Sequence, residues 1–158
     1  MIHNQLFKKE NIFFVIIIIS IFFIDRFSKY IIIKNFGNSE KIFNNYINLD
    51  LIWNTGIGFG IFSTSSSIIY NLITFLIGIV ILYLFYISII SKKIDKFIYC
   101  IIIGGALGNF YDRIVFQAVP DFIDLHYENF HWFTFNFADI FISIGVISFI
   151  LKSFFVND

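Results

Sequence analysis

The sequence predicts an all-α membrane protein with four transmembrane helices and a small extracytoplasmic β-element between helices 1 and 2. The first observation is composition, because 58% of the 158 residues are hydrophobic and only 14% are charged. A soluble domain of this length has no core large enough to bury so many apolar side chains. The second observation is that four apolar runs approach the length of about 20 residues that crosses the bilayer core. We therefore predict one integral-membrane domain over residues 1–158.

The first apolar run extends from Asn11 to Ile24. Its last turn carries polar side chains, and the apolar remnant Tyr30–Ile33 follows; the polar residues are Asp25, Arg26, Ser28 and Lys29. Lys8 and Lys9 precede this run, as in a secretory signal, but no small-residue cleavage site follows it. We interpret the run as a helix that stays in the protein.

The other three runs are predicted to be membrane helices as well. Ile68–Ile90 is the least interrupted and is long enough to cross with some tilt. A third run begins near Phe97 and continues to Leu107, and a fourth begins near Phe137 and continues to about Phe155. Both of these carry their polar residues at one end.

The segment between the first two helices contains the predicted β-element. Tyr46–Trp53 alternates apolar and polar residues in places and then reaches a glycine-rich turn, Asn54–Gly60. This pattern indicates short strands around a turn on the membrane surface. The glycine spacing is too short for the dinucleotide-binding fingerprint, which also requires a preceding strand and a following helix. Glycine here allows unusual backbone angles or a close approach to a ligand, and Asn54 either caps the turn or orients a bound peptide.

Orientation follows from helix parity and from lysines near the helix ends. Four crossings place both termini on the cytoplasmic side, together with the lysines at positions 8, 9, 92, 93, 96 and 152. Segments 25–67 and 113–136 then face outward, although they also contain Arg26, Lys29, Lys34, Lys41 and Arg113. Every polar group of interest falls on this outer side.

Charge and cysteine content exclude several function classes. The net charge is zero and there is no basic face, so nucleic acid is excluded as a partner. A single cysteine, Cys100, can form neither an intramolecular disulfide nor a cysteine-based zinc site. We expect a monomer without a cofactor, surrounded by membrane lipids.

Two carboxylates, Asp121 and Asp139, border long apolar stretches on the predicted outer side. Ionisable groups at the edge of hydrocarbon are costly to keep, which favours a functional role over simple helix capping. Two adjacent carboxylates share one proton and titrate as a unit. One of them can then draw a proton from water while the other donates to a carbonyl oxygen and later to the leaving amine.

The remaining polar and small residues allow both structural and functional interpretations. Asp25 and Lys29 are four residues apart and can form an ion pair, which either anchors the helix at the interface or fixes a surface loop near a site. Three glycines at positions 104, 105 and 108 indicate close helix packing. Arg113, near Asn109, either extends to the headgroups or holds a carboxylate.

Other chemistries have less support in the sequence. No serine or threonine is marked as a nucleophile, including the cluster at 63–67. His126 and His131 are five residues apart, which on a helix places them on different faces, and we interpret them as interfacial. Metal catalysis requires the aspartates themselves as ligands, and we predict no metal. Two alternatives of other classes are a proton or ion translocator, which needs acids near the middle of the membrane, and a structural subunit whose polar residues cap helices.

Five segments resemble, in order and spacing, the signature blocks of lipoprotein signal peptidase, or signal peptidase II. They are Asp25–Lys29, Asn54–Gly60, Gly104–Arg113, Val119–Asp124 and Phe135–Asp139. The resemblance covers nearly the whole chain. It departs at Pro120, where the family commonly has valine, at Ser28, which replaces threonine, and at Phe110 and Tyr111, which replace a more aliphatic pair.

This resemblance implies an aspartic endopeptidase of the bacterial plasma membrane with four crossings. Its substrate would be a prolipoprotein whose cysteine carries diacylglyceryl, cut immediately before that cysteine. By motif position, Asp121 and Asp139 would be the catalytic pair. The residues that would shape the site or hold the substrate are Asn54, Gly56, Asn109, Arg113, Asn136, Asp25 and Lys29.

Overall fold

The structure, a computed structural model, describes residues 9–35, 41–56, 67–128 and 130–155. These parts contain four helices that are long and apolar enough to cross a membrane. They are α2 (Lys9–Asn35), α3 (Ser67–Ile90), α4 (Lys93–Phe116) and α5 (Phe137–Phe155). The predicted helical membrane fold is confirmed.

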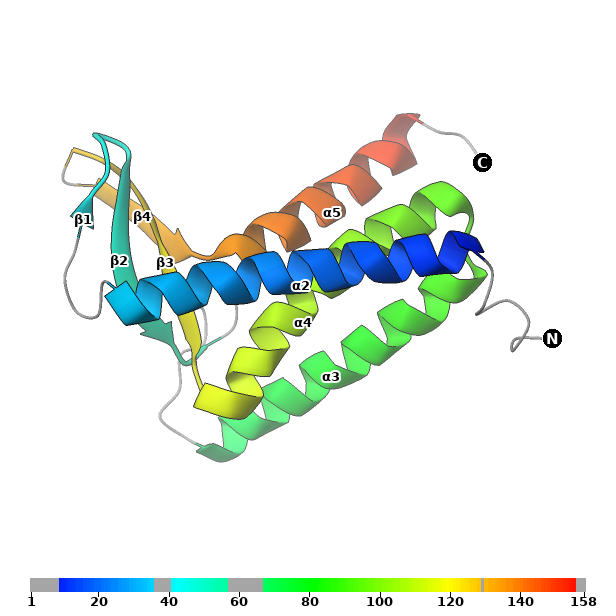
Figure 1. Cartoon of the computed structure of the whole chain (residues 1–158), viewed down its shortest axis with the longest axis horizontal. Coiled ribbons are helices and arrows are strands. Elements are labelled where there is room, and N and C mark those ends of the chain that lie inside the picture. The colour runs from blue at the N-terminus through cyan, green and yellow to red at the C-terminus, as the bar shows by residue number, and fades with distance from the viewer. Residues whose placement is uncertain (1–8, 36–40, 57–66, 129, 156–158) are drawn as a thin grey trace.

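A four-stranded antiparallel sheet lies at one end of the helix bundle, opposite the start of α2, the end of α5 and the α3–α4 turn (Figure 1). Its order is β1 (Lys41–Ile42), β2 (Ile47–Asn54), β3 (Val119–Tyr127) and β4 (Phe130–Phe135). The prediction confined the β-element to the segment between helices 1 and 2. That was too narrow, because β3 and β4 come from the segment between α4 and α5.

The burial of β3 and the exposure of β4 explain why the sequence did not predict these two strands. The first four residues of β3, Val119–Phe122, are all buried, so this part of the strand shows no alternation of apolar and polar residues. Four of the six residues of β4 are exposed, and they include Phe130, Trp132 and Phe133. Pro120 pairs with Trp53 in the part of β3 that β4 does not reach, where a missing backbone donor is tolerated.

Two helices are longer than the apolar runs indicated. The first continues through Asn35, so Asp25 and Lys29 lie inside the helix and not on its last turn. The helix α4 continues through Asp112 and Arg113 and ends at Gln117, which has a left-handed backbone φ of 54°. Both corrections have one cause: these polar side chains are buried in the bundle with hydrogen-bond partners, so they do not interrupt the helix.

Helix α4 contacts each of the other three helices, and its glycines allow this close approach. A Cβ atom on Gly104 would lie 2.8 Å from Cβ of Ile21 in α2. A Cβ atom on Gly105 would lie 2.6 Å from the carbonyl oxygen of Ala138 in α5. The predicted role of these glycines in close packing is confirmed.

Gly105→Ala is therefore expected to destabilise the protein by about 1–3 kcal/mol, because the added methyl group meets backbone that cannot rotate away. The same displacement moves the first turn of α5, so cleavage activity should fall as well. Thermal unfolding in detergent and a cleavage assay measure the two effects. Gly78→Ala is the matched control, because its Cβ would lie 3.1 Å from the ring of Phe110, a side chain that can shift. Equal effects of the two variants would contradict the packing argument.

Candidate active site

Asp139 lies in the first turn of α5, and Asn136 is the residue immediately before that helix. The Asn136 side-chain oxygen accepts from the backbone N–H of Asp139 at 3.1 Å. In return, Oδ2 of Asp139 accepts from the backbone N–H of Asn136 at 3.2 Å. This reciprocal pair is a capping box, and its sequence pattern, Asn-x-x-Asp before an apolar run, is a signal for the start of α5.

Asn136 also contacts the second carboxylate, Asp121, which lies on β3. Its side-chain Nδ2 donates to Oδ1 of Asp121 at 2.5 Å. Asn136 thus contacts both Asp121 and Asp139, although one of them lies on a strand and the other on a helix. All three side chains are buried, and Asn136 is fully enclosed.

Each carboxylate has a further amide donor on its other oxygen. Asn54, at the end of β2, donates from Nδ2 to Oδ2 of Asp121 at 2.8 Å. Asn109, on α4, donates from Nδ2 to Oδ1 of Asp139 at 2.8 Å. The two carboxylates are therefore fixed by neutral donors from three different elements.

The pKa of Asp121 is raised from its ordinary value to about 7. Burial of the carboxyl group is the main cause, and the nearby negative charge of Asp139 adds to it. The hydrogen bonds from Asn54 and Asn136 act in the opposite direction, because they stabilise the ionised form. The group therefore changes protonation close to neutral pH.

Arg113 connects α4 to the end of β2, and it does so through backbone carbonyl groups. Its Nη1 donates to the carbonyl oxygen of Asn109 and its Nη2 to that of Gly56, each at 3.1 Å. The backbone N–H of Gly56 donates to the side-chain oxygen of Asn54 at 2.8 Å, so Asn54 does cap its turn. Arg113 is buried, so it does not extend to the lipid headgroups. It also does not bond a carboxylate directly, because its guanidinium donates to backbone carbonyl oxygens.

Asp25 and Lys29 form the predicted ion pair, with Nζ 2.8 Å from Oδ2 of Asp25. Both side chains are 0% exposed, so the pair neither anchors the helix at the interface nor fixes a surface loop. Oδ1 of Asp25 accepts from the backbone N–H of Ala138 at 3.0 Å, which holds the start of α5 against α2.

Lys29 makes two further contacts, which sequence reasoning missed. Its Nζ lies 2.7 Å from Oδ2 of Asp112, and Arg26 contacts the other oxygen of that carboxylate. Nζ also donates to Oδ1 of Asn109 at 2.8 Å. Because Lys29 occupies the oxygen of this amide, its nitrogen is left to face Asp139. Asp112 lies near the end of α4, and the lysine that reveals its role lies 83 residues earlier in the sequence.

Residues 17–155 match the family model of signal peptidase (SPase) II. The chain belongs to the signal peptidase II family. It is 47% identical over 158 residues to the lipoprotein signal peptidase of Pelagibacter ubique, covering 98% of this chain and 95% of that protein. It is 38% identical to the lipoprotein signal peptidase of Francisella tularensis subsp. novicida, covering 84% and 86% of the two chains.

Two solved structures of bacterial membrane enzymes, both determined by the in meso method, have the same fold as this chain. One, at 2.3 Å resolution, has a TM-score of 0.72 at 28% identity and covers 89% of this chain and 87% of its own. The other, at 1.9 Å resolution, has a TM-score of 0.75 at 26% identity and covers 91% and 94%. The protein is thus a membrane aspartic peptidase of the bacterial inner membrane, and it removes signal peptides from prolipoproteins.

His126 and His131 lie on strands and not on a helix. His126 on β3 pairs with His131 on β4, and their rings stack with centroids 5.3 Å apart. Nδ1 of His131 lies 2.7 Å from Oδ2 of Asp124. Two features noted in the sequence lie outside the described residues. They are Gly58 and Gly60 of the glycine-rich turn, and positions 63–66 of the hydroxyl cluster.

Proposed function

We propose that Asp121 and Asp139 are the catalytic pair of this signal peptidase II and cut immediately before a cysteine that carries diacylglyceryl. The observation that carries this proposal is the contact of Asn136 with both carboxylates, through its side-chain amide and its backbone N–H. Two acids held at one point by neutral donors are suited to share a proton.

The charges around the pair support a single shared proton. Among the described residues that make up this network, three cations (Arg26, Lys29 and Arg113) accompany four carboxyl groups (Asp25, Asp112, Asp121 and Asp139). One added proton makes the network neutral, which is the favoured state for a buried cluster. Asp25 and Asp112 already contact cations directly, so the proton belongs to the catalytic pair.

The two carboxyl groups divide the work by environment. Asp139 lies at the positive end of the α5 dipole, which favours its ionised form, and it acts as the base that draws a proton from water. Asp121, with its pKa raised to about 7, carries the shared proton and donates it to the substrate carbonyl oxygen. As the tetrahedral intermediate collapses, one of its hydroxyl groups returns a proton to Asp121, which donates it to the leaving amine, and the pair keeps the single proton that Asp139 took from water. Asn54, Asn109 and Asn136 hold the carboxylates in place throughout.

The supporting residues keep the elements of the site together. Arg113 holds Gly56, and with it the end of β2, to α4. Asp25 and Lys29 hold the start of α5 and the amide of Asn109. We include all four as residues that shape the site without taking part in proton transfer.

The proposed orientation places the sheet and the carboxylate pair on the extracytoplasmic side and both termini in the cytoplasm. Cations at the sheet end weaken the charge asymmetry in the sequence. Lys29 and Arg113 are buried, however, and Arg26 is paired with Asp112. At the opposite end Lys92 and Lys93 are exposed, as expected for a cytoplasmic surface.

A lipid substrate is supported by a series of aromatic side chains near the sheet end. Trp53 lies 5.7 Å from Phe116, and Tyr111 lies 6.5 Å from the same ring, between centroids. Each of the three is more than 40% exposed, so together they offer apolar surface to a neighbouring acyl chain. The two glyceryl-linked chains of the substrate would approach through the bilayer, as a monomeric enzyme allows.

The test uses one prolipoprotein in two forms, with and without diacylglyceryl on its cysteine, and the purified enzyme in lipid. We expect cleavage of the modified form only, with a product whose N-terminal residue, identified by mass spectrometry, is the lipidated cysteine. Equal cleavage of both forms, or a cut at another bond, would overturn the proposed specificity.

The pH dependence of cleavage provides a second test. Asp121 holds its proton below about pH 7 and loses it above, so kcat/KM should fall as the pH rises through about 7. Asn54→Ala removes a hydrogen bond that stabilises the ionised form, so the fall should move to higher pH in that variant. A pH–rate profile that is flat from pH 6 to 9, or an unchanged midpoint in the variant, would contradict this assignment.

A further inference from the structure

A groove lies between α2, α3 and α4 at the end of the bundle away from the carboxylate pair, with a volume of about 180 Å³. Most of its lining is apolar and comes from Phe14, Ile18, Phe85, Ile89 and Cys100. A cavity of about 150 Å³ with such a lining is large enough to bind benzene and stays free of water. Val15, on the rim, is 51% exposed, so the groove opens toward the surrounding lipid.

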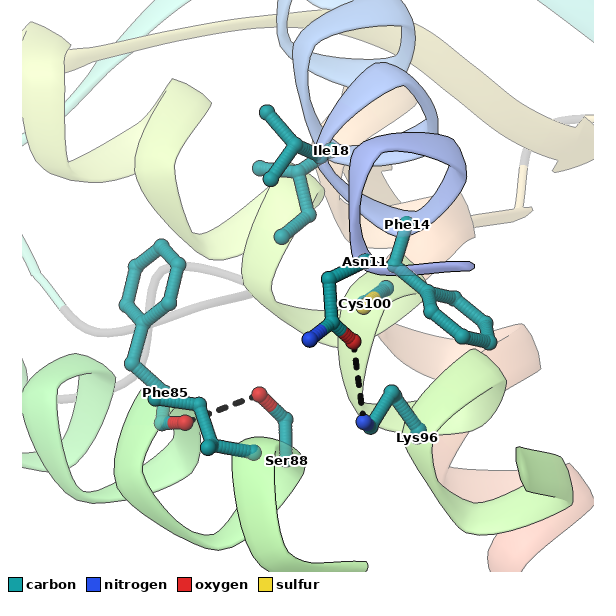
Figure 2. Close-up of a pocket in the computed structure, with 9 residues that line it drawn as sticks. Asn11, Phe14, Ile18, Phe85, Ser88, Lys96 and Cys100 are labelled. Carbon is teal, nitrogen blue, oxygen red and sulfur yellow. Dashed lines mark hydrogen bonds between the residues drawn. The ribbon is translucent and has the colours of Figure 1, made fainter. Parts of the chain in front are cut away.

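The polar groups of the groove gather at its outer end. Nζ of Lys96 donates to the side-chain oxygen of Asn11 at 3.1 Å and lies 5.6 Å from the ring centre of Phe14. Figure 2 shows this pair beside the ring of Phe14, with Ile18 farther from it. Cys100 is one turn deeper along α4, and Ile18 is about two turns deeper along α2. Polarity therefore decreases from the membrane surface inward, as it does along a phospholipid.

The charge of Lys96 is not balanced by a carboxylate among the described residues. The side chains that its Nζ contacts, Asn11 and Phe14, are neutral. The nearby carboxylate of Asp95 instead contacts Lys152 of α5 at 2.6 Å. The mouth of the groove thus favours an anion.

We propose that this groove binds an anionic phospholipid, with the phosphate group on Lys96 and one acyl chain between α2 and α3. Basic pockets between membrane helices bind lipid headgroups in this way, because a phosphate gains an ion pair while its chain stays in apolar surroundings. The site is separate from the carboxylate pair and does not depend on the proposed cleavage mechanism. Its occupant joins three helices and so stabilises the bundle from the end opposite the sheet.

Native mass spectrometry of the detergent-solubilised protein tests this proposal. Equal amounts of dioleoyl-phosphatidylglycerol and dioleoyl-phosphatidylcholine are added, and we expect the parent protein to retain the anionic lipid preferentially. Lys96→Gln should lower retention of phosphatidylglycerol about fivefold, the effect of one cation at the membrane surface. Lys93→Gln is the matched control, since it removes the same charge from an exposed position three residues away. An equal loss in both variants, or equal retention of both lipids by the parent, would overturn the proposal.

A second variant tests the apolar part of the groove. Ser88 is a buried lining residue on α3, and Ser88→Phe should fill the space and abolish retention of phosphatidylglycerol while Lys96 is still present. Undiminished retention by this variant would contradict the proposed site. The same spectra also record oligomers. If Ser88→Phe abolished a dimer but left the amount of bound lipid unchanged, the groove would bind a second copy of the chain and not a lipid.

Discussion

Asp121→Asn and Asp139→Asn are each expected to lower kcat for prolipoprotein cleavage by about 10²–10⁴-fold, the usual contribution of a general acid or base. An amide has nearly the same shape as the carboxyl group but cannot exchange the proton that the reaction needs. Binding of the substrate should change little, because its acyl chains and signal peptide contact other surfaces. Steady-state cleavage of a diacylglyceryl-modified prolipoprotein in lipid measures both quantities.

Asp124→Asn is the matched control for these two variants. It makes the same exchange on the same strand, three residues from Asp121, at a buried carboxylate that contacts His131. We expect it to cleave at a rate close to that of the parent protein. A folded Asp121→Asn or Asp139→Asn variant that retained the parent rate would refute the catalytic pair.

Lys29→Met is expected to destabilise the protein by about 3–5 kcal/mol, because it leaves Asp25 and Asp112 buried without the cation they share. It also frees the oxygen of Asn109, so the amide is no longer oriented toward Asp139 and cleavage should fall. The midpoint of thermal unfolding in detergent measures the first effect, and the cleavage rate at a temperature where the variant is folded measures the second.

Two further variants separate the ion pair from a general effect of losing a lysine. Lys34→Met removes an exposed lysine from the same helix, and this lysine makes only a long hydrogen bond to the hydroxyl group of Tyr30 among the contacts described. The free energy of unfolding of this variant should stay within about 0.5 kcal/mol of that of the parent. Adding Asp25→Asn to Lys29→Met removes one uncompensated charge and should recover part of the lost stability. If the double variant were less stable than Lys29→Met alone, buried charge would not be the cause.

The membrane helices could be predicted from the sequence because apolar length is a local property. The helix predicted from Phe137 to about Phe155 has those bounds in the structure, and the one predicted over Ile68–Ile90 begins one residue earlier. The prediction fell short where polar residues were assumed to end a helix. The first helix continues beyond Asp25 because that side chain is neutralised by Lys29 and held by Ala138, and these bonds come from packing.

The sheet was only partly predictable for a related reason. The partial alternation in Tyr46–Trp53 predicted a strand, and β2 lies there. In β3 the residues from Val119 to Phe122 are all buried, so the alternation that marks a strand is missing from the segment that carries Asp121. The register that pairs Asp121 with Ile52 depends on a β-bulge in β2, which sequence patterns do not specify.

The sequence by itself determined that this chain spans a membrane four times and which few polar side chains are too costly to bury without a role. The tertiary structure alone decided how those side chains pair. Hydropathy is summed along the chain and is independent of distant residues, whereas a hydrogen bond requires two atoms within about 3 Å, whatever their separation in sequence. Asn136 meets Asp121 from 15 residues away, and Lys29 meets Asp112 across 83 residues, so only the packed helices and sheet bring the site together.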